Sequence, residues 1–550
     1  MRCAFSLSKW LLRAMLVLGA AAAAAADGRL WFDGPRPGPL ALQAVDRLAA
    51  AASHGLDPLD YEADRLRLAV VQALQGPVPE TAAVERLERD LTAAMQRYLV
   101  HLHGGRVDPR QVHQNFALPR QDDFDVETVL QAALAARRLD QAEQAAVPKL
   151  PLYERLRAAL ARYRGLAAHA AWRQPLPPLP RPARGRVGKL EPGQPYDGVA
   201  LLAERLQVLG DLDDAAPWAP SAAPRAAAPA APPASAAQRT PAAPVYEAAL
   251  VDALKSFQQR HGLAADGVVG AATLKQLQVT PAERVRQIEL TLERLRWTPL
   301  LHGPRMIVIN IPEFVLRAYE VQDGRIGVQL TMKVIVGKAM DTRTPLFDED
   351  MRFIEFSPYW NVPPSIARSE VVPRLRRDPG YLARQGFEFV AGDGGVGSTP
   401  SAAALDAVLA GRQRIRQRPG PLNALGDIKF VFPNRSNIYL HHTPATQLFE
   451  RDRRDFSHGC IRVEQPVALA GFVLRGMPEW TEERIRQTMA AGVSSTLRLG
   501  EPVRVLIAYG TVLVKGGRIH FYDDIYGHDR LLDAALQRRT AERRNPDTRP

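Results

Sequence analysis

The 550-residue sequence has only two cysteines, Cys3 and Cys460, and no apolar run after residue 26 approaches the length of a membrane span. Two cysteines cannot build a disulfide scaffold, and a helix needs about 20 apolar residues to cross a bilayer. No collagen-like Gly repeat is present. Apolar residues make up 46% and charged residues 24% of the chain, which excludes a wholly disordered protein.

The length and charge of the chain set wider limits. At roughly 150 residues per domain, 550 residues predict three or four domains. The formal net charge is +12 and the pI is near 9.8, so an anionic partner is expected. Nucleic acid, anionic lipid and cell-wall polymer fit this charge equally well.

The N-terminus predicts an exported protein. Arg2, Lys9 and Arg13 precede the apolar run 14–26, which ends in alanines before Asp27. This is the pattern of a secretory signal peptide, here residues 1–26. As a helix the run rises about 20 Å, less than the hydrocarbon core of about 30 Å. Export makes nucleic acid an unlikely partner, and a membrane association is expected only if the segment stays uncleaved as an anchor.

Cys460 is then the only cysteine of the mature chain. A thiol without a partner is exposed to oxidation outside the cytoplasm, so its presence suggests a chemical use. The alternative is a buried cysteine that acts as a small hydrophobic residue.

The N-terminal half is expected to be helical. Residues 27–170 predict a helical scaffold domain, followed by a Pro-rich linker, 171–194. One helix of the scaffold has an apolar stripe at steps of three and four. The stripe consists of Val84, Leu87, Leu91, Met95, Tyr98 and Leu102.

Residues 195–278 predict a small helical domain with a disordered Ala/Pro insertion, 215–244. The segment from Phe257 to Leu274 contains the turn signal Asp266-Gly267 and resembles the peptidoglycan-binding domain of wall-active proteins. The alternative is a helical unit without a ligand. Residues 279–300 are expected to form a connecting helix.

The chain from 301 to 538 changes to strand patterns. Alternation at Ile307, Ile309 and Ile311 and strands over 430–440 and 503–522 predict a barrel-like or sandwich β domain. The polar, Arg-rich excursion 365–425 is long enough to predict a functional lid. Residues 539–550 are expected to be a disordered tail. The predicted fold class is therefore multidomain α+β.

The residues that carry chemistry lie between Ile438 and Val463. In a strand, period-two alternation places Tyr439 and His441 on one face. A second strand would place His458, Cys460 and Arg462 on one face. A histidine beside a thiol removes its proton, and the thiolate can attack a carbonyl. Gly459 would let backbone N–H groups approach an oxyanion, and Arg462 could bind a substrate carboxylate.

This stretch closely resembles the catalytic signature of the L,D-transpeptidases. In that family a histidine is followed, about fifteen residues later, by Ser/Thr-His-Gly-Cys, as here in His441 and the run 457–460. The likeness continues in the segments 357–363, 423–426 and 524–527. Together with the scaffold and the binding module it resembles the large type of this family found in the periplasm of Gram-negative bacteria.

The resemblance implies a cysteine acyltransferase. Cys460 would attack the bond between residue 3 and the D-alanine at position 4 of a peptidoglycan stem peptide, with His441 as the base. An amine of a second stem would resolve the thioester and give a 3→3 cross-link. Tyr439, Ser457, His458 and Arg462 would shape the pocket under a capping subdomain, 365–425. The resemblance implies stem peptides as partners, other wall-synthesis enzymes as further partners, no cofactor, and acylation by carbapenems.

Several alternatives stay open at this point. His441, His442, His458 and Cys460 are residue types that bind zinc, but their spacing is unlike that of zinc sites. The chain could be a wall-binding protein without catalysis, or a variant that trims stem peptides or attaches lipoproteins. Relatives of this type commonly have Asp where this chain has His442. On a strand, His442 is expected to face away from His441 and to weaken the support of the turn.

Overall fold

The computed structural model describes residues 29–112, 124–181, 188–213, 243–298, 303–323, 325–340 and 342–544. The predicted signal peptide lies outside the described residues, and so does the predicted Ala/Pro insertion except for residues 243 and 244. Among the described residues, no helix is both long enough and apolar enough to span a membrane.

The N-terminal scaffold is helical, as predicted. The apolar stripe of α4 is buried along its whole length, so the predicted periodicity is confirmed. A short hairpin and several helical turns complete this part. Its elements are β1 (Phe32–Asp33), β2 (Arg36–Pro37), α2 (Pro39–Ala49), η1 (Ala50–His54), η2 (Pro58–Tyr61), α3 (Ala63–Gln75), α4 (Thr81–Gly104), α5 (Pro109–Val112), α6 (Val126–Ala135) and α7 (Leu139–Ala146).

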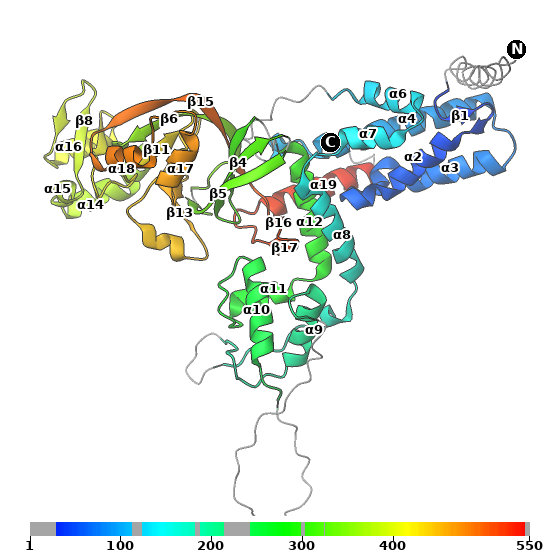
Figure 1. The fold of residues 1–550 in the computed structure, drawn as a ribbon, viewed down its shortest axis with the longest axis horizontal. Coiled ribbons are helices and arrows are strands. Elements are labelled where there is room, and N and C mark those ends of the chain that lie inside the picture. Colours follow the sequence, from blue (N-terminus) through cyan, green and yellow to red (C-terminus); the bar gives the residue numbers. More distant parts are fainter. Residues whose placement is uncertain are drawn as a thin grey trace, which may run out of the picture.

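Two long helices run from the scaffold toward the rest of the molecule (Figure 1). They are α8 (Pro151–Leu166), which precedes η3 (Ala170–Trp172), and α12 (Pro281–Trp297). A capping box starts α12: the Thr280 hydroxyl accepts from the Glu283 amide, and the Glu283 carboxylate accepts from the Thr280 amide. Helix α12 packs along α8 and against α19 (His528–Arg544).

The small helical unit consists of α9 (Val199–Leu209), α10 (Ala248–Arg260) and α11 (Ala271–Gln278) around its own core. Leu176, Leu179 and Leu190 of the predicted linker are buried in this core. The Pro-rich segment therefore packs onto the unit because its leucines are apolar. The unit contacts the hairpin β16 (Val512–Lys515) and β17 (Arg518–Phe521), where Arg260 donates to the Ile519 carbonyl at 3.1 Å.

The C-terminal part is built on a nine-stranded sheet whose order is β13-β5-β14-β12-β11-β6-β15-β3-β4. Strand β4 also pairs with β5, which closes the sheet into a barrel around an apolar core. The predicted barrel-like β domain is therefore confirmed. Its strands are β3 (Arg305–Asn310), β4 (Val315–Gln322), β5 (Arg325–Gly337), β6 (Phe347–Phe356), β11 (Ile428–Val431), β12 (Leu440–His441), β13 (Asp455–Ser457), β14 (Ile461–Val463) and β15 (Ser495–Ala508).

Two sequence expectations were wrong in this part. The predicted strand 430–440 is interrupted between β11 and β12, because the Asn434 side chain bonds both the amide and the carbonyl of Ile438. Asn437 has φ +52°, which completes this turn. The tail predicted from residue 539 is helical as far as Arg544, since α19 continues beyond the leucines that pack on α12.

The excursion 365–425, together with the preceding residues 360–364, forms a separate subdomain at the far end from the scaffold (Figure 1). A four-stranded sheet of order β7-β10-β8-β9 is covered by short helices around its own core. The strands are β7 (Trp360–Asn361), β8 (Phe387–Ala391), β9 (Val396–Gly397) and β10 (Gln413–Gln417). The helices are α13 (Pro364–Ile366), the π-helix η4 (Ala367–Val371), α14 (Val372–Arg377), α15 (Tyr381–Arg384) and α16 (Ala402–Leu409). Three helices lie between β11 and β15, namely η5 (Thr446–Glu450), α17 (Pro466–Val473) and α18 (Glu482–Ala490).

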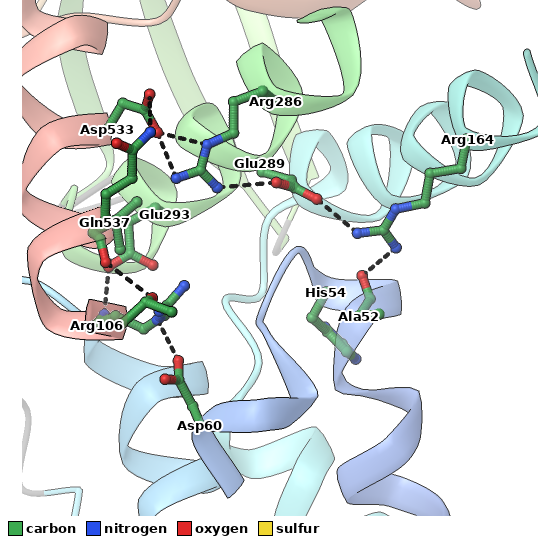
Figure 2. Close-up of polar contacts among 12 residues, drawn as sticks. Ala52, His54, Asp60, Arg106, Arg164, Arg286, Glu289, Glu293, Asp533 and Gln537 are labelled. Atoms are coloured by element: carbon green, nitrogen blue, oxygen red, sulfur yellow. Dashed lines mark hydrogen bonds and ion pairs between the residues drawn. The ribbon is translucent and has the colours of Figure 1, made fainter. Parts of the chain in front are cut away.

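A polar junction joins the scaffold, α8, α12 and α19 (Figure 2). Glu289 of α12 binds Arg164 of α8 at 2.7 Å and Arg286 at 3.1 Å, and Arg286 binds Asp533 of α19 at 2.7 Å. A cavity of about 520 Å³ lies here, and none of its lining residues belongs to the cysteine signature. We therefore interpret these contacts as structural.

Candidate active site

The signature residues meet where β12 and β14 pair. These strands are parallel, with Leu440 opposite Ile461 and His441 opposite Arg462. The Ile461 amide donates to the Tyr439 carbonyl at 3.1 Å, which places Cys460 beside Tyr439. Residues opposite one another in a sheet point to the same face. Cys460, which directly precedes β14, and His441 are therefore diagonal neighbours across the two strands.

Residues 458–460 form a bend between β13 and β14, so the predicted continuous strand was wrong. The reason is Gly459, whose φ of +113° breaks the extended backbone. The bend is fixed by hydrogen bonds from Thr344 Oγ1 to the Gly459 carbonyl at 2.7 Å and from Thr342 Oγ1 to the Ser457 carbonyl at 3.1 Å. The Gly459 amide donates to Ser457 Oγ at 3.2 Å. The Gly459 amide would have to break this hydrogen bond to Ser457 before it could donate to an oxyanion.

Cys460 is half-buried against the barrel core and is the free cysteine of the described residues. Its Sγ lies 3.8 Å from the Asn437 carbonyl oxygen. Burial raises the pKa of the thiol, while the amide and hydroxyl of Tyr439 and the charges of Lys429 and Arg462 lower it. The effect of burial is the largest, so the thiol is protonated near neutral pH.

His441 is 4% exposed, and its Nδ1 lies 2.5 Å from the carbonyl oxygen of His442. A carbonyl accepts hydrogen bonds only, so Nδ1 donates and Nε2 is left as the proton acceptor. Burial, with the nearby Arg462 charge, lowers the pKa of His441 to about 3. Among the described residues the thiol makes no hydrogen bond to this ring. The site therefore holds a neutral thiol and a neutral base rather than an ion pair.

The remaining predicted residues take different positions. Tyr439 packs its ring edge-on against His441 at 5.7 Å between centroids. Arg462 is half-buried, and its buried Nε has no hydrogen-bond partner among the described residues. Ser457 is buried beneath the bend and supports it through the Gly459 amide. His458 points toward the capping subdomain, where its Nε2 lies 2.6 Å from Glu370 Oε1.

His442 directly follows β12, so its expected orientation on a strand stays a prediction. Its Nδ1 is 3.3 Å from Asp427 Oδ2, and its ring covers Gly426, where an added Cβ would lie 2.6 Å from Nδ1. His442 therefore packs against the turn before β11, beside the Asp427 carboxylate. The hydrogen bond to the His442 carbonyl raises the pKa of His441 and the charge of the His442 ring lowers it, both less than burial and Arg462 lower it.

Sequence reasoning missed three residues around the site: Glu355, Glu370 and Lys429. Lys429 carried a usable signal, because it is the one charged residue in the apolar strand β11 and lies opposite His441. Glu370 carried none, since its contact with His458 spans 88 positions. Among the residues that the structure describes, no group of three histidine, cysteine or carboxylate side chains could hold a metal ion.

Comparison with protein families matches three parts of the chain. Residues 304–503 match the model described as "L,D-transpeptidase catalytic domain", and residues 23–160 match that of the "Scaffold domain". Residues 238–277 match the "Putative peptidoglycan binding domain". The last match includes α10 and α11, and the first contains the barrel, the capping subdomain and the cysteine signature.

One curated relative, from Haemophilus influenzae, is named "Putative L,D-transpeptidase". It is 31% identical over 250 residues, which cover 46% of this chain and 49% of the relative, so the chain spans about half the length of that relative. A solved structure, Bd1075 of Bdellovibrio bacteriovorus, is 14% identical with a TM-score of 0.16. It covers 44% of this chain and 56% of its own, and a likeness this low carries no argument.

Proposed function

We propose that this chain is a peptidoglycan L,D-transpeptidase with Cys460 as the nucleophile, since residues 304–503 match the L,D-transpeptidase catalytic domain and a curated relative bears that name. The proposal rests above all on the parallel register of β12 and β14, which aligns Cys460 with Tyr439 and puts His441 on the same face. The match to a peptidoglycan-binding domain supports the same polymer as substrate.

The acylation step follows from the protonation states of the two groups. The neutral imidazole of His441, with Nε2 as the proton acceptor, takes the thiol proton as the sulfur attacks the carbonyl between residue 3 and D-Ala4. The S–C bond forms, and the C–N bond then breaks. The imidazolium gives the same proton to the leaving amine of D-alanine. Because burial disfavours the charged ring, proton transfer accompanies attack and does not precede it.

In the second step an amine of another stem attacks the thioester. The amine gives a proton to His441 Nε2, the S–C bond breaks, and the thiolate is reprotonated as the 3→3 amide bond is completed. The half-buried guanidinium of Arg462 is suited to a stem carboxylate, because a guanidinium binds carboxylates in a planar geometry. No cofactor is needed for any of these steps.

The test is muropeptide analysis of cells that lack similar enzymes and express either the wild type or Cys460→Ala. Cross-linked 3→3 dimers that require Cys460 support the proposal. Tripeptide stems without dimers would indicate an L,D-carboxypeptidase, and stem peptides on a lipoprotein would indicate an attaching enzyme. If no product depends on Cys460, the chain is a wall-binding protein without catalysis.

Two further expectations belong to the same proposal. A carbapenem is expected to acylate Cys460, seen as a mass increase that Cys460→Ala abolishes. The charged and apolar N-terminus predicts a periplasmic protein. Fractionation with N-terminal sequencing of the mature chain tests export and cleavage together.

A further inference from the structure

Strand β11 places a lysine next to the proposed catalytic pair. Ile428 and Phe430 are fully buried in the barrel core, so the intervening Lys429 faces the other side of the sheet. Lys429 lies opposite His441 on β12 and opposite Glu355 on β6. With Arg462 opposite His441, these side chains form one row across four strands, on the face that carries Cys460.

The ammonium group of Lys429 is held by two contacts. Its Nζ lies 3.0 Å from Glu355 Oε2 and 4.5 Å from the centre of the Tyr439 ring. The side chain of Lys429 is only 17% exposed, so water screens its charge weakly. The Tyr439 hydroxyl and amide in turn interact with the thiol of Cys460. Lys429 and the sulfur of Cys460 therefore both contact Tyr439.

Charges around the sulfur come from few groups. His441 is neutral and adds no positive charge in the resting state. Lys429 of β11 and Arg462 of β14 both lower the pKa of Cys460, against the larger effect of burial. Glu355 of β6 and the Tyr439 phenol are the other titratable groups on this face. His458 is paired with Glu370 of the capping subdomain.

We propose that Lys429 is a positioning residue of the active site, whose ammonium group, fixed between Glu355 and the Tyr439 ring, makes the Cys460 thiol reactive. A cation on the ring face polarises the phenol, which then donates more strongly to the sulfur as negative charge develops. Glu355 holds the lysine in place and at the same time offsets part of its charge. The inference rests on the proposed role of Cys460 as the nucleophile.

Two variants of the same ion pair separate this role from a structural one. The rate of alkylation of Cys460 by iodoacetamide is measured against pH in the full-length protein, by mass spectrometry of the peptide that contains Cys460. Lys429→Met is expected to slow alkylation about threefold to tenfold at fixed pH, since an unscreened unit charge at this range shifts a pKa by about half a unit to one unit. Glu355→Gln, which keeps an acceptor for the lysine, is expected to leave the rate unchanged or to raise it.

The proposal predicts that Lys429→Met lowers the alkylation rate and that Glu355→Gln does not, and this difference is the test. If the pair only stabilises the sheet, removing either partner lowers the rate equally, and that result overturns the proposal. Lys429→Arg keeps the charge and should restore at least half of the rate. Lys333→Met is the matched control, because Lys333 pairs with Glu464 at 3.6 Å on the same sheet and does not act on Cys460. A loss as large in Lys333→Met as in Lys429→Met also overturns the proposal.

A failure of the proposed role of Lys429 is distinguishable from a failure of the proposed function. Alkylation reports the thiol itself and needs no peptidoglycan substrate. If Cys460→Ala cells still form all 3→3 dimers, the nucleophile is wrong whatever the alkylation rates are. If the dimers depend on Cys460 but Lys429→Met alkylates like the wild type, only the role of Lys429 is wrong.

Discussion

The Nε2 atom of His458 lies 2.6 Å from Oε1 of Glu370, and this contact joins the bend that carries Cys460 to the capping subdomain. Glu370 lies in η4, a π-helical segment, and such segments occur often at functional sites. The two side chains are 31% and 51% exposed, so solvent screens the pair. It is suited to positioning the subdomain more than to stabilising the fold.

Glu370→Ala should therefore weaken substrate binding without unfolding the protein. We expect KM for a tetrapeptide donor to rise about twofold to fivefold, with kcat changed less, because the subdomain is less firmly docked over the bend. The free energy of unfolding should change by less than about 1 kcal/mol, as for exposed ion pairs. Steady-state kinetics and urea denaturation measure the two effects. An unchanged KM together with a loss of stability would contradict this interpretation.

The neutral state of His441 predicts the pH dependence of activity. With the pKa of His441 lowered to about 3, the ring stays unprotonated from pH 5 to pH 8. The ratio kcat/KM should therefore show no acid limb in this range, whereas a histidine with an ordinary pKa near 6.5 would produce one. A rate that falls tenfold between pH 7 and pH 5, with the fold intact by circular dichroism, would show that His441 is charged or that another group is the base.

The same burial predicts acid sensitivity of the catalytic domain. His441 has a pKa of about 3 in the folded state and near 6.5 in the unfolded chain. Between these pH values the folded state therefore binds fewer protons than the unfolded chain does. This contribution to stability is present above pH 6.5 and is lost between pH 6.5 and pH 3, up to about 5 kcal/mol. Urea denaturation at pH 7 and pH 4 should show a smaller loss in His441→Gln than in the wild type. His458→Gln is the control, because His458 is exposed.

Local patterns predicted the elements of the fold that depend on periodicity. The apolar stripe of α4 and the alternating isoleucines of β3 are buried as expected, since a helix or strand face that is apolar in sequence packs inward. The break between β11 and β12 was missed, because it depends on one side chain, Asn434, replacing a ladder hydrogen bond. The burial of Leu176 and Leu179 depends on a long-range contact with another unit, which composition alone cannot reveal.

The sequence predicted which signature residues lie at the site, but not the protonation states of the thiol and the imidazole. Period-two reasoning placed Tyr439 and His441 on one face, and the register of β12 and β14 agrees. The catalytic roles of these residues stay predictions. The neutral thiol and imidazole could not be foreseen, because a pKa depends on burial, which the sequence gives only on average. Glu370 and Glu355 act across long sequence separations, so no motif could identify them.

Glu293 of α12 is the buried carboxylate on which the junction of Figure 2 depends. It accepts from the Arg106 and Val107 amides of the scaffold, and its Oε2 lies 2.7 Å from Nη1 of the fully buried Arg296. Glu293→Ala should destabilise the protein by about 3–5 kcal/mol, because it leaves a buried guanidinium without its partner. Thermal denaturation measures this loss. The exposed pair Glu154 and Arg157 is the control, where Glu154→Ala should cost less than about 1 kcal/mol.

Gly459 shapes the bend that presents the thiol. Its φ of +113° lies in a region that residues with a Cβ rarely adopt, and an added Cβ would lie 3.2 Å from Ile438 Cδ1. Gly459→Ala should strain this backbone by about 1–3 kcal/mol or turn the bend away from its present path. Because a displacement of about 1 Å at a reacting centre can cost a hundredfold in rate, kcat/KM should fall by about that factor.

The fold itself should survive this change, because the bend is also held by Thr342 and Thr344. Gly471→Ala in α17 is the matched control, since nothing lies within 4 Å of its added Cβ and alanine favours a helix. This control should keep full activity and gain up to about 1 kcal/mol of stability. If Gly459→Ala acylates with a carbapenem at the rate of the wild type, the left-handed backbone at this position does not position the sulfur, and the geometry of the bend is not what limits the reaction.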